Sequence, residues 1–381
     1  MRFDFTDEQQ MWHDTVHRFV EGEGGGREYA RRCDMERRYP YELYDKVAKQ
    51  GWLGLLVPEE YGGMGADAMF YAIFMGAMGK YSVDLSSAFG VSTFTAMNLV
   101  RHGTRQQQEK YLPAFIEGRI RFSISMTEPN AGSDVASLTT RAELKGDHFV
   151  LNGQKVFASA AHARDNIICM AVRTDPTAPK HKGISLVLVP NDTPGLELRL
   201  LPTLARRATG TNEIFLTDVR VPSQNLLGAL NGGWRYLVEH LEIERLAIAA
   251  GYVACAQTAV SDALRYAKER HQFGRAIGEF QVIKHMLADM QTQVDAATLM
   301  VYRVAYLASQ GRACTREAAM AKLIGSETLL DVATKGMQIL GGYAQLPEYD
   351  MERYWREGKQ ATVGGGTSQI QRSIIAKTLG L

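Results

Sequence analysis

The residues best suited to chemistry form a polar loop about one third of the way along the chain. Residues 126–134 read MTEPNAGSD and directly follow the apolar run Phe122–Ser125. Such a loop presents hydroxyl and backbone N–H groups, which suit the polar edge of a bound ring or a phosphate. A capped turn would explain its proline and glycine, but it has less need for Thr127, Ser133 and Asp134 together.

A second candidate is an arginine at the end of a predicted helix. Residues 269–274 read ERHQFG, and Phe280 and Gln281 follow shortly after. An arginine beside an aromatic side chain can clamp a phosphate and stack on a ring. A helix C-terminus also favours cations without any ligand, so both interpretations stay open.

The third candidate is a pair of glycine-rich segments near the carboxyl end. They are Gln338–Gly342 (QILGG) and Gly364–Arg372 (GGGTSQIQR). Glycines let a backbone approach a ligand closely, although either segment could be an ordinary helix stop.

Other patterns favour neither a metal nor a nicotinamide site. His13 and His17 have the i, i+4 spacing of metal ligands, but the glutamate of a zinc hydrolase is absent and the helix face is polar. Residues 63–68 (GMGADA) match GxGxxA, yet no strand precedes them and no βαβ unit follows. The cysteines lie far apart without a CxxC pair, which argues against a disulfide framework or a thiolate metal site: Cys33, Cys169, Cys255 and Cys314.

The elements that must position these residues fall into an α, β, α order. This order predicts an α+β, mainly α fold with a helical domain over 1–118, a β-barrel-like domain over 119–230 and a helical bundle over 231–381. Thr6 to Gln9 form a capping box that opens the first helix. Further helices are expected around 41–50, 66–80, 106–117, 234–270, 280–309 and 315–340, and strands at 148–151, 167–172, 184–190, 196–200 and 213–221.

Composition and charge limit the kinds of binding partner that we expect. The 381 residues carry 43 Lys+Arg against 42 Asp+Glu, a net charge of +1, which gives no reason to expect nucleic acid or an acidic membrane surface. The longest apolar stretch, 246–260, is shorter than the roughly 18 residues that a membrane span needs. The amino terminus, MRFDFTDEQQ, fits neither a secretory signal nor a transit peptide. We therefore expect a cytoplasmic protein with no membrane or nucleic-acid partner.

Taken together, the motifs resemble those of the acyl-CoA dehydrogenase family of flavoproteins. The resemblance runs from GWLG at 51–54 and PEEYGG at 58–63, through the loop 127–134 and DVRVP at 218–222, to Gly366-Thr367. Several separated motifs in the right order make it specific. It implies a helical domain, a β domain and a four-helix domain, in agreement with the pattern above.

The resemblance also implies FAD as cofactor and assigns residues to it. In the middle of the chain these are Ile124, Met126, Thr127, Gly132 and Ser133, with Phe157 and Ser159 over the flavin face. Nearer the carboxyl end, Arg270, Gln272, Phe273, Gln281, Gln338, Gly341 and Gly342 match residues that reach the FAD of a neighbouring subunit, and Thr367 and Gln369 match residues on the chain's own flavin. An oligomer is therefore implied, a dimer of dimers by resemblance.

The catalytic base is implied to lie on a helix. Family chemistry removes the proton next to a thioester carbonyl while a hydride leaves for the flavin. Many members carry the base just before Gly-Thr, where this chain has Gly365; a subgroup carries it before an arginine on the first long helix of the carboxyl-terminal domain, where this chain has Glu244-Arg245. Glu244 is thus the expected base, Gly365 the expected backbone donor to the thioester oxygen, and Ser133, Arg245 and Gly365 the expected substrate contacts.

Helical geometry supports this choice. Glu242 and Glu244 lie roughly 200° apart around a helix, so they cannot face the same site. Glu244 shares its face with Ala247, Gly251 and Ala254, a stripe of small residues that would leave room for a ligand. Tight packing of another helix over that stripe is the alternative.

The function implied is α,β-dehydrogenation of an acyl-CoA thioester, with electrons passed to an electron-transfer flavoprotein. One alternative is the same desaturation on an acyl or aminoacyl group tethered to a carrier protein. Another is a non-catalytic binding protein of this fold, which the near-zero net charge disfavours for nucleic acid. A flavin monooxygenase of this fold would need no positioned carboxylate, so Glu244 disfavours it.

Overall fold

The computed structural model describes residues 4–381, and these divide into two compact units. The helical unit comprises Met1–Met35, Asp67–Ser87 and Glu242–Leu381. The sheet unit comprises Glu36–Ala66 and Ala88–Leu241. Each unit is therefore built from segments that are far apart in the sequence.

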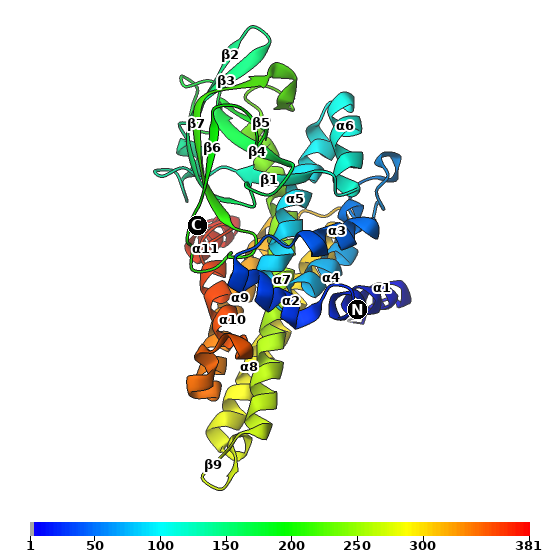
Figure 1. Ribbon diagram of the computed structural model, residues 1–381, viewed down its shortest axis with the longest axis vertical. Helices are drawn as coiled ribbons and strands as arrows, with labels where there is room; N and C mark the ends of the chain where they lie inside the picture. The colour runs from blue at the N-terminus through cyan, green and yellow to red at the C-terminus, as the bar shows by residue number, and fades with distance from the viewer. Residues whose placement is uncertain (1–3) are drawn as a thin grey trace. The chain divides into compact units, whose positions relative to one another are not determined.

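Long amphipathic helices dominate the helical unit. Buried side chains of α7, α8, α9 and α10 form one core cluster. The paths of these helices can be followed in Figure 1. The first helix begins at a capping box, as predicted, because the Thr6 hydroxyl accepts the N–H of Gln9. The elements are α1 (Asp7–Glu21), α2 (Gly26–Glu36), α4 (Ala68–Gly79), α7 (Gly233–Glu269, whose first residues belong to the sheet unit), β9 (His271–Gln272), β10 (Arg275–Ala276), α8 (Gln281–Ser309), α9 (Thr315–Leu340), the 3₁₀ turns Gly341–Gln345 and Pro347–Tyr349, α10 (Met351–Ala361) and α11 (Ser368–Thr378).

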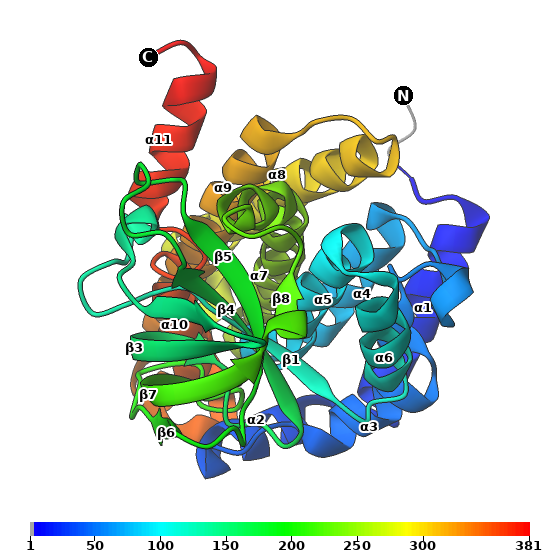
Figure 2. The same cartoon turned by 90° about the horizontal axis from the view of Figure 1, so that it is seen from above.

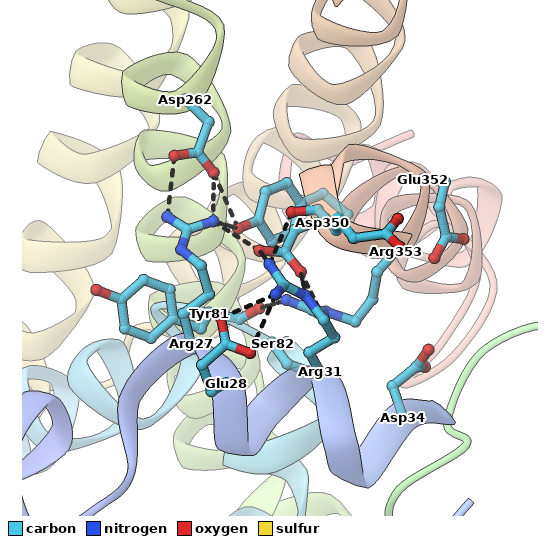
Figure 3. A network of polar contacts seen from close by, with 12 residues as sticks. Arg27, Glu28, Arg31, Asp34, Tyr81, Ser82, Asp262, Asp350, Glu352 and Arg353 are labelled. Carbon is cyan, nitrogen blue, oxygen red and sulfur yellow. Dashed lines mark hydrogen bonds and ion pairs between the residues drawn. The ribbon is translucent and has the colours of Figure 1, made fainter. Parts of the chain in front are cut away.

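Buried ion pairs tie α2 to α7 and to the start of α10 (Figure 3). Arg27 bonds to Asp262 at 2.6 Å and to Asp350 at 2.7 Å. Arg31 donates to the Asp350 carboxylate and, at 2.8 Å, to the backbone carbonyl of Glu348. Asp350 is fully buried, so these arginines provide the opposite charge that a buried carboxylate requires.

The sheet unit contains one eight-stranded, mostly antiparallel sheet (Figure 2). Its strand order is β6-β7-β3-β2-β4-β5-β8, and β1 pairs in parallel with β4. Alternating apolar residues of these strands form a second core cluster. The elements are α3 (Tyr41–Lys49), α5 (Val83–His102, whose first turn belongs to the helical unit), α6 (Arg105–Ile116), β1 (Arg121–Ser125), β2 (Arg141–Lys145), β3 (His148–Ser159), β4 (Asn166–Arg173), β5 (Ile184–Pro190), β6 (Leu196–Leu200), β7 (Thr211–Pro222) and β8 (Leu226–Leu227).

The predicted fold class is confirmed, and so are all the predicted helices and strands within a few residues, except that β3 extends well beyond 151. Four helices were not predicted: α2, α5, α10 and α11. Helix α5 was missed because polar side chains on its buried face hide the apolar period; Ser92, Thr95 and Asn98 are all fully buried.

Helix α7 is long and apolar enough to cross a membrane by length and composition alone. Within the protein, however, 78% of its apolar window is buried, as in a core helix. The stretch 246–260 was read as too short to span; the helix around it is longer, but its burial removes the argument for a span.

Candidate active site

In the sheet unit, a buried ion pair fixes the polar loop that follows β1. Lys155 on β3 donates to Glu128 at 2.8 Å and to the Met126 carbonyl at 3.1 Å. The Glu128 carboxylate also accepts the backbone N–H groups of Thr139 and Thr140. The loop is therefore held from β3 and from the two residues just before β2, with the Met126 carbonyl turned toward Lys155.

The charges of this pair follow from the same contacts. Burial by itself would raise the pKa of Glu128, but the Lys155 charge and several hydrogen bonds lower it to about 2. Burial lowers the pKa of Lys155 to about 8, against the opposing effect of Glu128. Both groups are therefore charged at neutral pH.

The expected flavin-face residues lie beside this loop. The Val156 N–H donates to the Thr127 carbonyl at 2.9 Å, which joins the loop to β3. The pairing of β3 with β7 is irregular between Lys155 and Ala158, and Phe157 there has φ of +61° and an exposed ring. A left-handed conformation is unusual for phenylalanine, and such strain occurs most often at functional sites. The structure thus groups Thr127 with Phe157, while Ile124, Met126 and Ser159 are half-buried and Gly132 and Ser133 exposed.

In the helical unit, a cavity of about 420 Å³ opens between the end of α7 and the turn after α9. Among its lining residues are Arg270, Gln272, Gly341 and Gly342, which sequence analysis assigned to one ligand. The Arg270 guanidinium lies over the Tyr343 ring, 5.6 Å from its centroid. A Cβ atom placed on Gly341 or Gly342 would meet nothing within 4 Å, so the backbone here faces open space. A cation, aromatic rings and accessible backbone fit the phosphates and a ring of a dinucleotide such as FAD.

Three residues assigned to the same ligand do not line this cavity. Phe273 is 93% exposed on the β9–β10 hairpin, and its ring lies 6.2 Å from that of Phe280. Gln281 and Gln338 are also exposed. Their assignment stays a prediction that concerns a neighbouring subunit.

The second glycine segment forms a tight turn between α10 and α11. Gly365 has φ of +63° and is exposed, and Thr367 caps α11 through the Ile370 N–H, while Gln369 is exposed. In the part of the chain that the structure describes, the N–H groups of Gly365 and Gly366 donate to no hydrogen bond. Two adjacent unused donors at an exposed turn are the requirement for holding an oxygen that gains negative charge.

This turn lies against the stretch of α7 that carries the expected base. A Cβ atom on Gly365 would lie 2.9 Å from the Ile248 side chain, and Ile248 is one helical turn beyond Glu244. Glu244 itself is half-buried. Arg245 is buried, and its Nε atom has no hydrogen-bond partner among residues 4–381. Burial lowers the pKa of Arg245, while the carboxylates of Glu244 and Glu242 act in the opposite direction.

The small-residue stripe on α7 has a different role from the one expected. A Cβ atom on Gly79 of α4 would come within 2.6 Å of the Gly251 Cα atom, and one on Gly76 would meet Ala254 at 3.9 Å. The expectation that Gly251 and Ala254 leave room for a ligand is therefore wrong. They let α4 approach α7 closely, so the stripe carries no argument for Glu244.

Glu242 points elsewhere, as predicted. Its carboxylate accepts hydrogen bonds from the N–H of Cys314 at 3.3 Å and from the Thr315 hydroxyl. It therefore serves the N-terminus of α9, where negative charge is favourable. Burial, together with this carboxylate, raises the pKa of the Cys314 thiol to about 12.

Sequence analysis missed four side chains that hold these segments. Glu128 was counted only as part of the loop, and Lys155 was not singled out. Lys322 and Gln371, both fully buried, bond to carbonyls of the turn at 361–366. A lysine within a run of buried residues is the signal that could have found Lys155 and Lys322, since a buried cation needs specific partners.

No group of three or more His, Cys, Asp or Glu side chains among residues 4–381 is placed to hold a metal ion. The fold combines long helices with one β-sheet, and the helical unit holds a cavity lined in part by Arg270, Gly341 and Gly342. The chain matches the family models for the N-terminal domain (residues 6–119), the middle domain (123–219) and the C-terminal domain (231–380) of acyl-CoA dehydrogenases. It belongs to the acyl-CoA dehydrogenase family and is an FAD-dependent oxidoreductase acting on CH–CH bonds.

The similar proteins include a dehydrogenase, a subunit of a reductase complex and a carrier-protein oxidase. A probable acyl-CoA dehydrogenase (YngJ) of Bacillus subtilis is 39% identical, with both chains fully covered. The CarC subunit of the caffeyl-CoA reductase-Etf complex of Acetobacterium woodii is 37% identical over 90% of each chain. The crystal structure of the prolyl acyl carrier protein oxidase AnaB matches with a TM-score of 0.93 at 30% identity, covering 99% of this chain and 100% of the other.

Proposed function

We propose that this protein oxidises an acyl-CoA thioester to the trans-2-enoyl-CoA and that Glu244 removes the α proton. The observation that carries the proposal is the exposed Gly365 turn, which has unused N–H groups and lies against Ile248, one helical turn beyond Glu244 on α7. A carboxylate and an oxyanion site on neighbouring elements are the two parts that enolisation of a thioester requires.

Each residue of the proposed site has its own role in the reaction. The Glu244 carboxylate takes the proton from the carbon next to the carbonyl. The N–H of Gly365 binds the thioester oxygen and stabilises the charge that develops there. Arg245 and Ser133 contact the substrate. Many members of the family carry the base at the position of Gly365. Glycine has no side chain there, so Glu244 is the one carboxylate that we assign to the site.

FAD supplies the hydride acceptor when bound. The chain would hold it with the loop from Ile124 to Ser133, with Phe157 and Ser159, and with Thr367 and Gln369. Arg270, Gln272, Gly341 and Gly342 would bind the phosphates and adenosine of a neighbouring subunit's FAD, together with Phe273, Gln281 and Gln338. This assignment requires an oligomer, and we propose a dimer of dimers.

We further propose an electron-transfer flavoprotein as the acceptor and the cytoplasm as the location. The relationship to a reductase that works in a complex with Etf supports the first proposal. Electrons that reach FAD as a hydride must leave before the next turnover, so the cycle needs such an acceptor.

The test is an anaerobic titration of the FAD-loaded protein with a panel of acyl-CoA esters. We expect at least one ester to bleach the flavin absorbance and to release the enoyl-CoA after reoxidation. A protein that binds FAD but is bleached by no acyl-CoA ester, of any chain length or branching, would contradict the proposal.

The alternative substrate is the same acyl group on a carrier protein, and the similarity to AnaB favours it. The two are separated by presenting one acyl group both as a CoA ester and on a carrier-protein phosphopantetheine arm. Faster turnover of the CoA ester supports the first proposal, and turnover of the carrier-bound group alone supports the second.

A further inference from the structure

A buried lysine lies beneath the glycine turn that the proposed function uses. Lys322 on α9 is fully buried, and its ammonium donates to the carbonyls of Ala361 at 2.9 Å and Gly366 at 2.7 Å. Hydrogen bonds from a charged donor are roughly twice as strong as neutral ones. The turn is therefore fixed from below at two points.

A neutral side chain supports the same turn. Gln371 on α11 is fully buried, and its amide donates to the carbonyls of Gly365 at 3.1 Å and Gly366 at 3.2 Å. A Cβ atom on Gly366 would lie only 2.7 Å from this amide nitrogen. Glycine at 366 is thus what lets Gln371 approach the backbone.

The direction of the carbonyls sets the direction of the N–H groups. In a trans peptide the C=O and N–H bonds point to opposite sides. Because the Gly365 carbonyl points to Gln371, the N–H of Gly366 in the same peptide points away from the interior. Neither this Gly366 N–H nor the N–H of Gly365 donates a hydrogen bond to a residue within 4–381.

We propose that Lys322 is a positioning residue for the thioester. By binding the carbonyls of Ala361 and Gly366 it fixes the turn that carries the unused N–H groups on both sides of these groups, and its charge favours the enolate over the neutral thioester. A fixed charge in a buried position acts without the screening of water, so its effect at the turn exceeds that of a surface lysine. This inference rests on the proposed function of the turn.

The experiment compares two ligands on the FAD-loaded protein. Acetoacetyl-CoA ionises readily to an enolate, whereas S-butyl-CoA is a thioether with no carbonyl oxygen. We expect Lys322→Met to weaken acetoacetyl-CoA binding by about tenfold or more, with S-butyl-CoA binding changed less than about twofold. Lys322→Arg, which keeps the charge, should recover part of the loss.

The matched control is Lys335→Met. Lys335 lies on the same helix, and its ammonium is paired with Asp331 at 2.7 Å, so both affinities should stay at the wild-type values. If Lys322→Met fails to fold, Gln371→Leu gives the same test, with a smaller selective loss expected because the amide is uncharged.

The outcomes distinguish a failure of the role of Lys322 from a failure of the proposed function. Equal losses for both ligands, or no loss for either, would overturn the role of Lys322. If the wild-type protein neither binds acetoacetyl-CoA nor is bleached by any acyl-CoA, the proposed function itself fails. A wild-type protein that does both, with no selective loss in the variants, leaves the function intact and removes only this inference.

Discussion

Two glycine-rich turns, one after α9 and one after α10, differ in the surroundings of their glycines. At Gly341 and Gly342 a Cβ atom would meet nothing within 4 Å, and the backbone borders a cavity with Arg270 and Tyr343. At Gly365 and Gly366 a Cβ atom would lie within 3 Å of Ile248 and Gln371. The first turn borders open space, whereas the second is packed against neighbouring side chains and has unused N–H groups.

Helix α10 connects the two turns and is fixed at both ends. Its beginning is held by the buried ion pairs of Asp350 with Arg27 and Arg31 (Figure 3). Its end is held by the bond from Lys322 to Ala361. The two turns to which we assign ligand contacts are therefore linked by a helix that buried polar bonds hold at both ends, which favours precise positioning.

The largest effect should come from removing the base beside the second turn. Glu244→Gln keeps the shape of the side chain but not its basicity, so flavin reduction by the best acyl-CoA should slow by about 10² to 10⁴ or more. FAD content and substrate affinity should stay near the wild-type values. Stopped-flow absorbance measures the rate, and wild-type reduction by this variant would refute the assignment.

Glu242→Gln is the matched control on the same helix. Glu242 bonds to the start of α9, so its replacement should lower the free energy of unfolding by about 1 kcal/mol and leave the reduction rate unchanged. A large rate loss here would mean that the site tolerates no change in α7.

The first turn should respond in cofactor binding instead of rate. Losing a charged phosphate contact in Arg270→Ala should weaken FAD retention by about 10- to 100-fold. Because the FAD in question is proposed to belong to a neighbour, mixing this variant with Glu244→Gln should restore some active sites. FAD release during gel filtration measures retention. Arg275→Ala is the control, since Arg275 lies over Phe280 and does not line the cavity.

Moving the carboxylate to the second turn tests how tightly that turn is packed. Glu244→Gln with Gly365→Glu should recover little activity, because residue 365 has φ of +63° and a Cβ atom there meets Ile248 at 2.9 Å. Adding Ile248→Ala removes the contact, and we expect about a tenfold gain in reduction rate over the double variant. Equal rates in the double and triple variants would show that Ile248 does not limit the second turn.

The smallest effect is a pH dependence of stability through α10. Glu357 is fully buried, and burial, with Asp84 and Asp34 nearby, raises its pKa to about 7 despite the opposing charge of Arg353. A raised carboxyl pKa contributes stability that is present below the unfolded value of 4.5 and is lost as pH rises through 7. Glu357→Gln should therefore gain stability relative to wild type between pH 5 and pH 8 in urea unfolding.

Glu128→Gln in the sheet unit should behave in the opposite way. The pKa of Glu128 is lowered to about 2, so its contribution is present above the unfolded value of 4.5 and is lost as pH falls toward 2. This variant should be destabilised at neutral pH, and the difference should shrink in acid. The same sign for both variants would contradict the assigned environments.

The sequence determined much of this protein by itself. Apolar periodicity predicted the helices α7, α8 and α9 and the strands β4, β5, β6 and β7 within a few residues, because these elements bury one regular face or a continuous apolar run. The order of motifs predicted the family and its cofactor. It also placed Arg270, Gln272, Gly341 and Gly342 on one ligand, and the structure brings these four residues together at one cavity.

Only the tertiary structure decided what the small residues and buried charges do. The sequence suggested that Gly251 leaves room for a ligand, but α4 lies against it. A small residue permits either a ligand or a neighbouring helix, so the sequence alone could not distinguish the two. Lys322 reaches Ala361 and Gly366 from 39 and 44 residues away, and no local period encodes such a contact. Side-chain bonds to distant carbonyls depend on where the chain returns, so the support beneath the active turn became visible only in the folded protein.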